Sequence, residues 1–315
     1  MTALAPLVTI VLPTYNGAAL VRRALDALLA QEYPSIDILV ADDVSTDDTA
    51  SICEEYAARY PRIRVQRNVR NLRAWENFAQ LARQASGKYL LWASQDDWWD
   101  PRFVAALVEP MERDPEFVAA LSAVRFTYVN EVAPPFISRF TGKSRPDRQS
   151  RRALLKAMFS KRSADGAMNR TNMYIHGLVR TRSFQAAMAA YPGVILHERQ
   201  VVCHWVLKGR LAYVDEVLCE KHKNLVPVGQ RHGEEAAFVV ARSSPFLALR
   251  YASDMVGSIL RSGDIPAERK FWAVACAWYY LAASARKQAE RALIGALPKS
   301  LLQVISGRRK AKRAP

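Results

Sequence analysis

Cysteine is scarce in this chain of 315 residues, and its four thiols are widely spaced, at Cys53, Cys203, Cys219 and Cys276. So few cysteines exclude a small domain built on disulfides, and the absence of a Cys-x-x-Cys pair excludes the common zinc and redox motifs. We therefore expect reduced thiols in a cytosolic protein.

Long hydrophobic runs are also missing. No stretch reaches the roughly 18 consecutive apolar residues of a membrane-spanning helix. The nearest approach, residues 271–285, ends at Arg286 and is expected to be a buried or interfacial helix. The first residues carry no basic segment ahead of an apolar one, so we expect no signal peptide.

Acidic residues are few in one half of the chain only. The whole sequence has 45 Lys and Arg against 30 Asp and Glu, a formal charge of +15, and is 50% hydrophobic. This composition excludes a disordered or collagen-like chain. Residues 1–130 hold 13 basic and 17 acidic side chains, whereas residues 131–315 hold 32 and 13. A function must therefore use both a mildly acidic half and a strongly basic half.

The first 130 residues alternate between apolar strand patterns and amphipathic helix patterns. We expect strands at 8–13, 37–41, 63–67, 88–93 and 117–129, separated by helices at 18–31, 46–59, 73–85 and 101–113. This alternation predicts an α/β fold with a mostly parallel sheet and helices on both faces.

The second half follows a less regular pattern. A loop rich in Pro and Arg is expected over 131–172, around a short helix at 151–159. Further strands are expected at 174–180 and 211–218, and further helices at 182–190 and 198–208. From residue 244 onward the pattern is helical and ends in a basic tail.

Polar clusters follow three of the predicted strands, at residues 14–16, 42–43 and 96–97. The carboxyl ends of parallel strands meet at one edge of a sheet, where such folds bind ligands. Asp96 and Asp97 supply the oxygen ligands that Mg²⁺ and Mn²⁺ prefer. Alternatively, they would only place negative charge at a helix N-terminus. Three polar strand ends on one edge favour the ligand site.

Three motifs together resemble the family-2 glycosyltransferases: VTIVLPTYNG at 8–17, ILVADDVSTDDT at 38–49 and GKYLLWASQDDWWDP at 87–101. The resemblance covers residues 8–121 well and continues more weakly to about 222. It implies a GT-A fold, a Rossmann-like mostly parallel sheet, over 1–225. Residues 1–130 would then form the donor and metal half and 131–225 the acceptor half. Residues 226–315 would be a helical, basic C-terminal region.

The resemblance also implies which residues bind the nucleotide-sugar. They are Pro13, Tyr15, Asn16, Asp42, Asp43, Asn71, Arg73 and Asp96. The Tyr15 ring would stack on the base, and Asp42 would accept the N3–H of a uracil or thymine. The alternatives are core packing for Tyr15 and a helix cap for Asp42.

A divalent cation, Mn²⁺ or Mg²⁺, is implied as the cofactor. Asp96 matches the last Asp of the family's metal motif and Asp97 follows it, whereas Ser94 stands where the first Asp is usual. The cation would rest on Asp96, Asp97 or both, together with diphosphate oxygens. His222 would be a further metal ligand or a phosphate contact, and the alternative is a basic surface turn.

An inverting transfer needs a general base that removes the proton of the acceptor hydroxyl. In the family this carboxylate begins a helix that precedes a glycine and a strand, here at LKGRLAYVDEVL, residues 207–218. The resemblance therefore places the base at Glu198. The alternative is a helix-terminal charge paired with Arg199.

The basic half suggests an anionic partner. Aromatic residues at 272–281 precede a Lys- and Arg-rich tail, which suits attachment to an anionic membrane surface. We expect a cytoplasmic enzyme on the inner face of a bacterial membrane, with a UDP- or dTDP-sugar donor and a glycan or lipid-linked acceptor in cell-surface polysaccharide synthesis. One alternative is a nucleic-acid-binding protein, but no such motif is present. The other is a catalytically impaired homologue that still binds the donor.

Overall fold

The computed structural model describes the N-terminal half almost completely and the C-terminal third in part. The described residues are 4–128, 134–142, 145–150, 153–154, 175–190, 197–223, 253, 256–271, 274–275 and 278, with 197–200 and 223 described by their backbone only.

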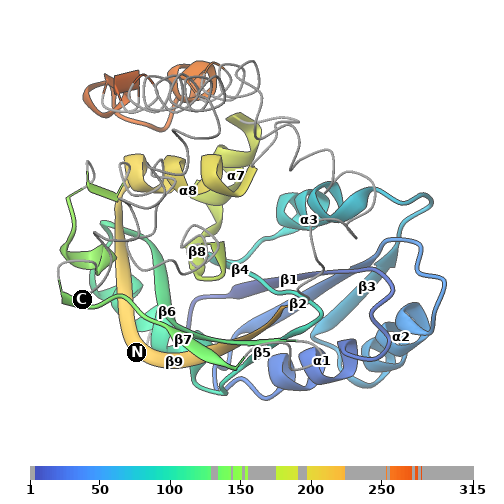
Figure 1. Ribbon diagram of the computed structural model, residues 1–315. Coiled ribbons are helices and arrows are strands. Elements are labelled where there is room, and N and C mark those ends of the chain that lie inside the picture. The colour runs from blue at the N-terminus through green and yellow to red at the C-terminus, as the bar shows by residue number, and fades with distance from the viewer. Residues whose placement is uncertain are drawn as a thin grey trace, which may run out of the picture.

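A single mixed sheet forms the centre of the described fold (Figure 1). Its strands are β1 (Val8–Thr14), β2 (Ile36–Asp42), β3 (Ile63–Arg67), β4 (Tyr89–Trp92), β5 (Asp97–Trp99), β6 (Phe117–Tyr128), β7 (Phe136–Ser138), β8 (Leu178–Arg180) and β9 (Arg210–Lys223). The helices are α1 (Val21–Leu29), α2 (Thr49–Arg59), α3 (Arg73–Gln84), α4 (Phe103–Arg113), α7 (Thr181–Ala190), α8 (His197–Lys208) and the short 3₁₀ helix η3 (Pro146–Arg148).

The strand order is β3-β2-β1-β4-β8-β6-β9-β5, with β7 paired to β6. Strands β1 to β4 are parallel to one another, and β6 and β9 form a further parallel pair. Strands β5, β7 and β8 pair antiparallel to their neighbours. The chain thus has the expected α/β architecture, a mixed sheet in which most strands run in one direction.

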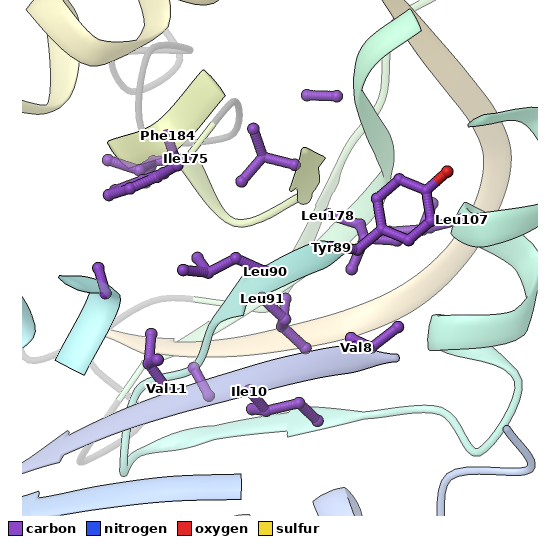
Figure 2. Close-up of a cluster of buried hydrophobic side chains, with 14 of the residues drawn as sticks. Val8, Ile10, Val11, Tyr89, Leu90, Leu91, Leu107, Ile175, Leu178 and Phe184 are labelled. Carbon is purple, nitrogen blue, oxygen red and sulfur yellow. The ribbon is translucent and has the colours of Figure 1, made fainter. Parts of the chain in front are cut away.

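Helices cover both faces of the parallel part of the sheet. In Figure 1, α1 and α2 lie on one side of β1–β3, and α3 and α7 lie on the other. An apolar strand such as β1 is buried on both faces for this reason. Val8, Ile10 and Val11 are fully buried against β4, and Figure 2 shows them beside Leu90 and Leu91. Each such side chain stabilises the fold by about 1.5–3 kcal/mol.

The order of β1 to β4 creates a switch point in the sheet. From β1 the chain proceeds to β2 and β3 on one side, and β4 then pairs with the other side of β1. In open α/β sheets the crevice at the carboxyl ends of the strands beside such a point is the usual ligand site. Here the loops after β1 and β4 flank it.

Most elements expected in residues 1–128 are confirmed, with shifted ends, and β3 has the expected bounds. The strand expected at 174–180 is wrong in length, because only Leu178–Arg180 pairs with β4 and β6. Strands β5 and β7 were not expected. Of the helix expected at 151–159 only residues 153–154 are described, and they are helical; most of residues 226–315 lie outside the described residues.

The structure describes three of the four cysteines and the helices that could be tested as membrane spans. Cys53, Cys203 and Cys219 are buried free thiols. Across the described ranges, no helix combines the length and apolar character needed to cross a membrane.

Candidate active site

The loops that follow β1 and β2 are joined by hydrogen bonds between side chains and backbone. The Asn16 N–H donates to Ser45 Oγ at 3.0 Å, and the Thr46 N–H donates to Asn16 Oδ1 at 2.9 Å. The next residue, Gly17, donates its N–H to Thr49 Oγ1 at 2.7 Å. Two of the three predicted polar strand ends therefore form one connected rim.

Three residues around this rim adopt a left-handed backbone although none is glycine. They are Asn16 after β1, with φ 46°, Val44 after β2, with φ 64°, and Arg73 at the start of α3, with φ 68°. This conformation is costly for a β-branched residue such as Val44. Strained backbone of this kind concentrates at functional sites, where surrounding contacts hold it.

Asp42 is fully buried, and its carboxylate is bound by other residues of the protein. Its Oδ2 accepts the Ser45 N–H at 3.0 Å, its Oδ1 accepts the Ser45 hydroxyl, and Arg67 Nε lies 3.5 Å from Oδ2. These contacts shape the loop that holds Asn16. A base N3–H would have to share an oxygen that Ser45 already uses, so the predicted contact between Asp42 and the base stays a prediction.

Asp43 organises the loop that leads into α3. Its Oδ1 accepts Asn68 Nδ2 and the Leu72 N–H, both at 2.7 Å, and its Oδ2 accepts the Arg73 N–H at 2.8 Å. Asn71 Nδ2 donates to the Asp43 carbonyl at 3.1 Å. The structure thus brings Asp43, Asn71 and Arg73 together, as the predicted set requires.

Tyr15 is held at the rim by its backbone and presents its side chain to solvent. Its side chain is half-exposed, with 48% of the residue accessible. Gln95, from the loop after β4, binds both backbone groups of Tyr15: Oε1 accepts the N–H and Nε2 donates to the carbonyl, each at 2.9 Å. Pro13 lies opposite Ala41 in the ladder of β1 and β2. An aromatic ring free to stack fits the predicted role of Tyr15.

The two aspartates after β4 have different surroundings. Asp97 is 3% exposed and forms an ion pair with Lys221 of β9. Burial raises the pKa of Asp97, and the Lys221 charge opposes that rise. The half-buried Asp96 makes no hydrogen bond or ion pair with any residue that the structure describes. Asp96 is therefore the carboxylate available to a ligand, and the pairing argues against Asp97 as a metal ligand.

The donor set at this position fits a cation that completes its coordination on a bound diphosphate. In the described part of the chain, no three His, Cys, Asp or Glu side chains are grouped as a metal site. Mg²⁺ and Mn²⁺ commonly use one or two carboxylates together with substrate phosphates and water. Asp96 would then be the protein ligand, and the phosphates would supply the rest.

His222 lies on β9 next to Lys221, but its ring faces α1. Arg23 Nη1 donates to His222 Nε2 at 3.0 Å, and Arg23 Nη2 binds Glu220 Oε1 at 2.9 Å. A nitrogen that accepts from a guanidinium has no lone pair left for a metal. This contact argues against His222 as a metal ligand, which stays a prediction.

Glu198 is the second residue of α8, at the start of a helix as predicted, and its side chain lies outside what the structure describes. Farther along α8, the buried His204 lies 3.0 Å from Asp264, and Lys208 lies 2.7 Å from the same carboxylate. Arg269 donates to the Lys208 carbonyl at 2.5 Å. The segment 256–271 thus fixes the second half of the helix that begins with Glu198.

Comparisons with known proteins agree with this geometry. A family model described as "Glycosyl transferase family 2" matches residues 9–174, which include every loop of the rim. The chain belongs to glycosyl transferase family 2.

Curated relatives match a little over a third of the chain. An uncharacterized protein of Mycobacterium tuberculosis, Rv1520, is 38% identical over 124 residues, 38% of this chain and 36% of the relative. The Escherichia coli chondroitin synthase is 30% identical over 110 residues, 35% of this chain and 16% of the synthase. The matches thus span well under half the length of these relatives.

Solved structures share the fold at low sequence identity. Staphylococcus aureus TarS 1-349 in complex with UDP-GlcNAc has a TM-score of 0.59 at 18% identity, over 85% of this chain and 70% of that chain. The mannosyltransferase PcManGT of Pyrobaculum calidifontis, in complex with GDP-Man and Mn²⁺, has a TM-score of 0.54 at 19% identity, over 99% and 82%. Both likenesses establish the GT-A-like fold of the family.

Three residues of this family-2 site were not predicted from the sequence. Gln95 lies inside the metal motif, and its position between Ser94 and Asp96 was a usable signal. Ser45 lies in the DD-x-S motif at residues 42–45, so its position was also a usable signal. Lys221 and its partner Asp97 are 124 residues apart in sequence, so no local pattern could pair them.

Proposed function

We propose that this chain is an inverting glycosyltransferase that moves a sugar from a nucleotide-sugar to a hydroxyl group of a glycan or lipid-linked acceptor. One observation carries the proposal. The hydrogen-bonded rim brings to the switch point of a family-2 fold an exposed aromatic ring, Tyr15, and the carboxylate of Asp96, which has no hydrogen bond or ion pair among the described residues. This pairing suits a donor with an aromatic base at one end and a diphosphate at the other.

The residues of the rim would act by positioning the donor. Tyr15 would stack on the base, and Asp42, at the end of the neighbouring strand β2, would favour a pyrimidine nucleotide, UDP or dTDP. Asn16, Asp43, Asn71 and Arg73 would hold the loops around the nucleoside in the shape described above. Because hydrogen bonds within the protein already fix these loops, little conformational entropy would be lost on binding.

Asp96 would hold a divalent cation, Mn²⁺ or Mg²⁺, against the diphosphate. When bound, that cation neutralises negative charge that develops on the departing nucleoside diphosphate. Lys221 would keep the neighbouring Asp97 paired inside the protein, so that Asp96 alone faces the donor. The Mn²⁺ in the complex of PcManGT with GDP-Man supports a divalent metal at this kind of fold.

Glu198 would remove the proton of the acceptor hydroxyl as that oxygen attacks the anomeric carbon. A carboxylate suits this role because one positioned base opposite the leaving group is required. Its place at the start of α8, a helix that the segment 256–271 fixes at the other end, supports a defined orientation. Such a geometry inverts the configuration at the anomeric carbon.

The acceptor and the cellular location are further parts of the proposal. The relative named chondroitin synthase supports a role in polysaccharide synthesis. In the C-terminal region, Leu260, Phe271 and Trp278 are 53–70% exposed, close to several Lys and Arg residues. This combination supports attachment to the inner, anionic surface of a bacterial membrane, where lipid-linked acceptors lie.

The test is a panel of UDP-, dTDP- and GDP-sugars, with and without Mn²⁺, in which binding is followed by thermal shift and turnover by release of the nucleoside diphosphate. We expect turnover with one donor class, and a loss of about 100-fold or more for Asp96→Ala and for Glu198→Gln. Glu116→Gln is the matched control, because Glu116 is exposed at the opposite end of the sheet. Binding of a donor with no turnover in any condition would instead identify an impaired homologue.

A further inference from the structure

Gln95 connects the Tyr15 loop with the Asp96 loop, two parts of the site that the sheet itself leaves unconnected. The ladder between β1 and β4 ends at the pair Val11 and Trp92, and the last backbone bond runs from the Ala93 N–H to the Val11 carbonyl. Beyond that point the two strands diverge.

The Gln95 side chain restores the connection as a strand neighbour would. Its amide satisfies the N–H and the carbonyl of Tyr15 at 2.9 Å each, across 80 residues of sequence. A side-chain amide that makes both bonds to one residue has a single orientation, because its oxygen only accepts and its nitrogen only donates. The position of the Tyr15 backbone therefore depends on the position of Gln95, and Asp96 is the residue that follows Gln95.

Gly17 leaves the space in which this amide lies. A Cβ atom at Gly17 would lie 2.3 Å from Gln95 Cδ and 2.4 Å from Gln95 Oε1. Real Cβ atoms do not approach so closely, so any larger residue would move the amide and break its bonds to Tyr15. The sequence thus provides both the amide and the gap that holds it.

We infer that Gln95 is a positioning residue that couples nucleotide binding at Tyr15 to cation binding at Asp96. This inference rests on the proposed function, in which Tyr15 contacts the base and Asp96 holds the cation. A cation that orders the Asp96 loop orders Tyr15 through Gln95, and a base on Tyr15 orders Asp96 in return. By thermodynamic linkage, the cation and the base change each other's binding affinity by the same factor.

The first experiment uses the full chain and Mn²⁺ alone, with no nucleotide. Hydrogen exchange measured by mass spectrometry follows the backbone amides of a peptide that covers residues 12–18. We expect Mn²⁺ to slow this exchange about 3-fold or more in the wild type, and to have no effect on it in Gln95→Met, which fills the space without hydrogen bonds. Gln84→Met is the matched control, because Gln84 is exposed and its side chain binds only Gln66 among the hydrogen bonds of the described residues.

The second experiment measures the coupling directly. Mn²⁺ is titrated by calorimetry with and without uridine, which has no phosphate and so cannot bridge to the metal. We expect uridine to tighten Mn²⁺ binding about 5-fold or more in the wild type and in Gln84→Met, and by less than about 2-fold in Gln95→Met. Guanosine replaces uridine if uridine alone does not bind.

The outcomes separate this inference from the proposed function. If Mn²⁺ binds in a manner that Asp96→Ala abolishes, but Gln95→Met responds to it as the wild type does, the coupling role of Gln95 is wrong and the proposed site stands. If Mn²⁺ does not bind the wild type even when UDP is present, or Asp96→Ala leaves its binding unchanged, the proposed cation site is wrong and the inference falls with it.

Discussion

Lys221 of β9 and Asp97 of β5 form an ion pair, and their side chains are only 6% and 3% exposed. They lie opposite each other in the antiparallel ladder of β5 and β9. The short strand β5 exists because of this ladder, since three residues alone have too few local contacts to form a strand. The pair thus fixes the polypeptide immediately after Asp96.

Removing Lys221 should destabilise the protein strongly. Lys221→Met leaves the Asp97 carboxylate buried without its partner, which costs about 3–5 kcal/mol in comparable cases. We expect a lower urea midpoint in equilibrium unfolding. The double variant Lys221→Met with Asp97→Leu should recover most of that loss, because no buried charge remains. A single variant as stable as the wild type would show that the pair does not stabilise the fold.

Asp264 should make the stability of the contact between segment 256–271 and α8 depend on pH. Burial alone would raise the pKa of Asp264, but its contacts with His204, Lys208 and Ser262 outweigh that effect and hold the pKa well below its ordinary value. A carboxylate with a lowered folded-state pKa contributes stability that is complete above its unfolded pKa of about 4 and is lost as the pH falls toward the folded value.

The corresponding variant is Asp264→Asn. At pH 7 it should be less stable than the wild type by about 2 kcal/mol, because charge-assisted hydrogen bonds to the carboxylate are lost. The difference should shrink as the pH falls below about 4. Glu268→Gln is the control, because Glu268 lies on the same segment and is 76% exposed. A difference that is constant from pH 7 to pH 3 would contradict the role of the charge.

Gly17 and Gln95 should show non-additive effects on stability. Gly17→Ala forces its Cβ against the Gln95 amide, which must move aside, so the substitution should cost about 1 kcal/mol through the lost hydrogen bonds to Tyr15. In the background of Gln95→Ala the space is open, so the same substitution should cost less than about 0.5 kcal/mol. Thermal unfolding of the four proteins of this cycle measures the coupling. Equal costs in both backgrounds would place the amide elsewhere.

The C-terminal region should determine binding to anionic vesicles. Substitution of Phe271 and Trp278 by Gln, or deletion of residues 299–315, should each reduce partitioning onto phosphatidylserine-containing vesicles about 10-fold or more, since each basic residue near the surface contributes about 1 kcal/mol. Sedimentation with vesicles measures the fraction of protein that is bound to them. Val69→Gln is the control, because Val69 is fully exposed in the loop before α3. Unchanged sedimentation of both variants would remove the membrane proposal.

Some parts of the site followed from local sequence, and others did not. The positions of Tyr15, Asp42 and Asp96 at strand ends could be predicted, because buried parallel strands are continuous apolar runs whose ends are marked by polar turn residues. That Asp97 is paired and Asp96 is not, among the described residues, could not be predicted. The two residues are adjacent and chemically identical, and only the distant Lys221 distinguishes them.

The sparse cysteine excluded disulfide scaffolds, the alternation of strand and helix patterns predicted an α/β fold, and the resemblance to family-2 glycosyltransferases implied an enzyme with a basic C-terminal region. The sequence by itself determined the order of strands and helices in the first 128 residues, apart from β5, and the edge at which the polar residues gather, because these depend on short-range periodicity. Only the tertiary structure decided which carboxylate is free, which side chain ties the Tyr15 loop to the Asp96 loop, and which segment holds α8. These choices depend on contacts between residues 56 to 124 positions apart in the chain, and such contacts exist only after the sheet has formed.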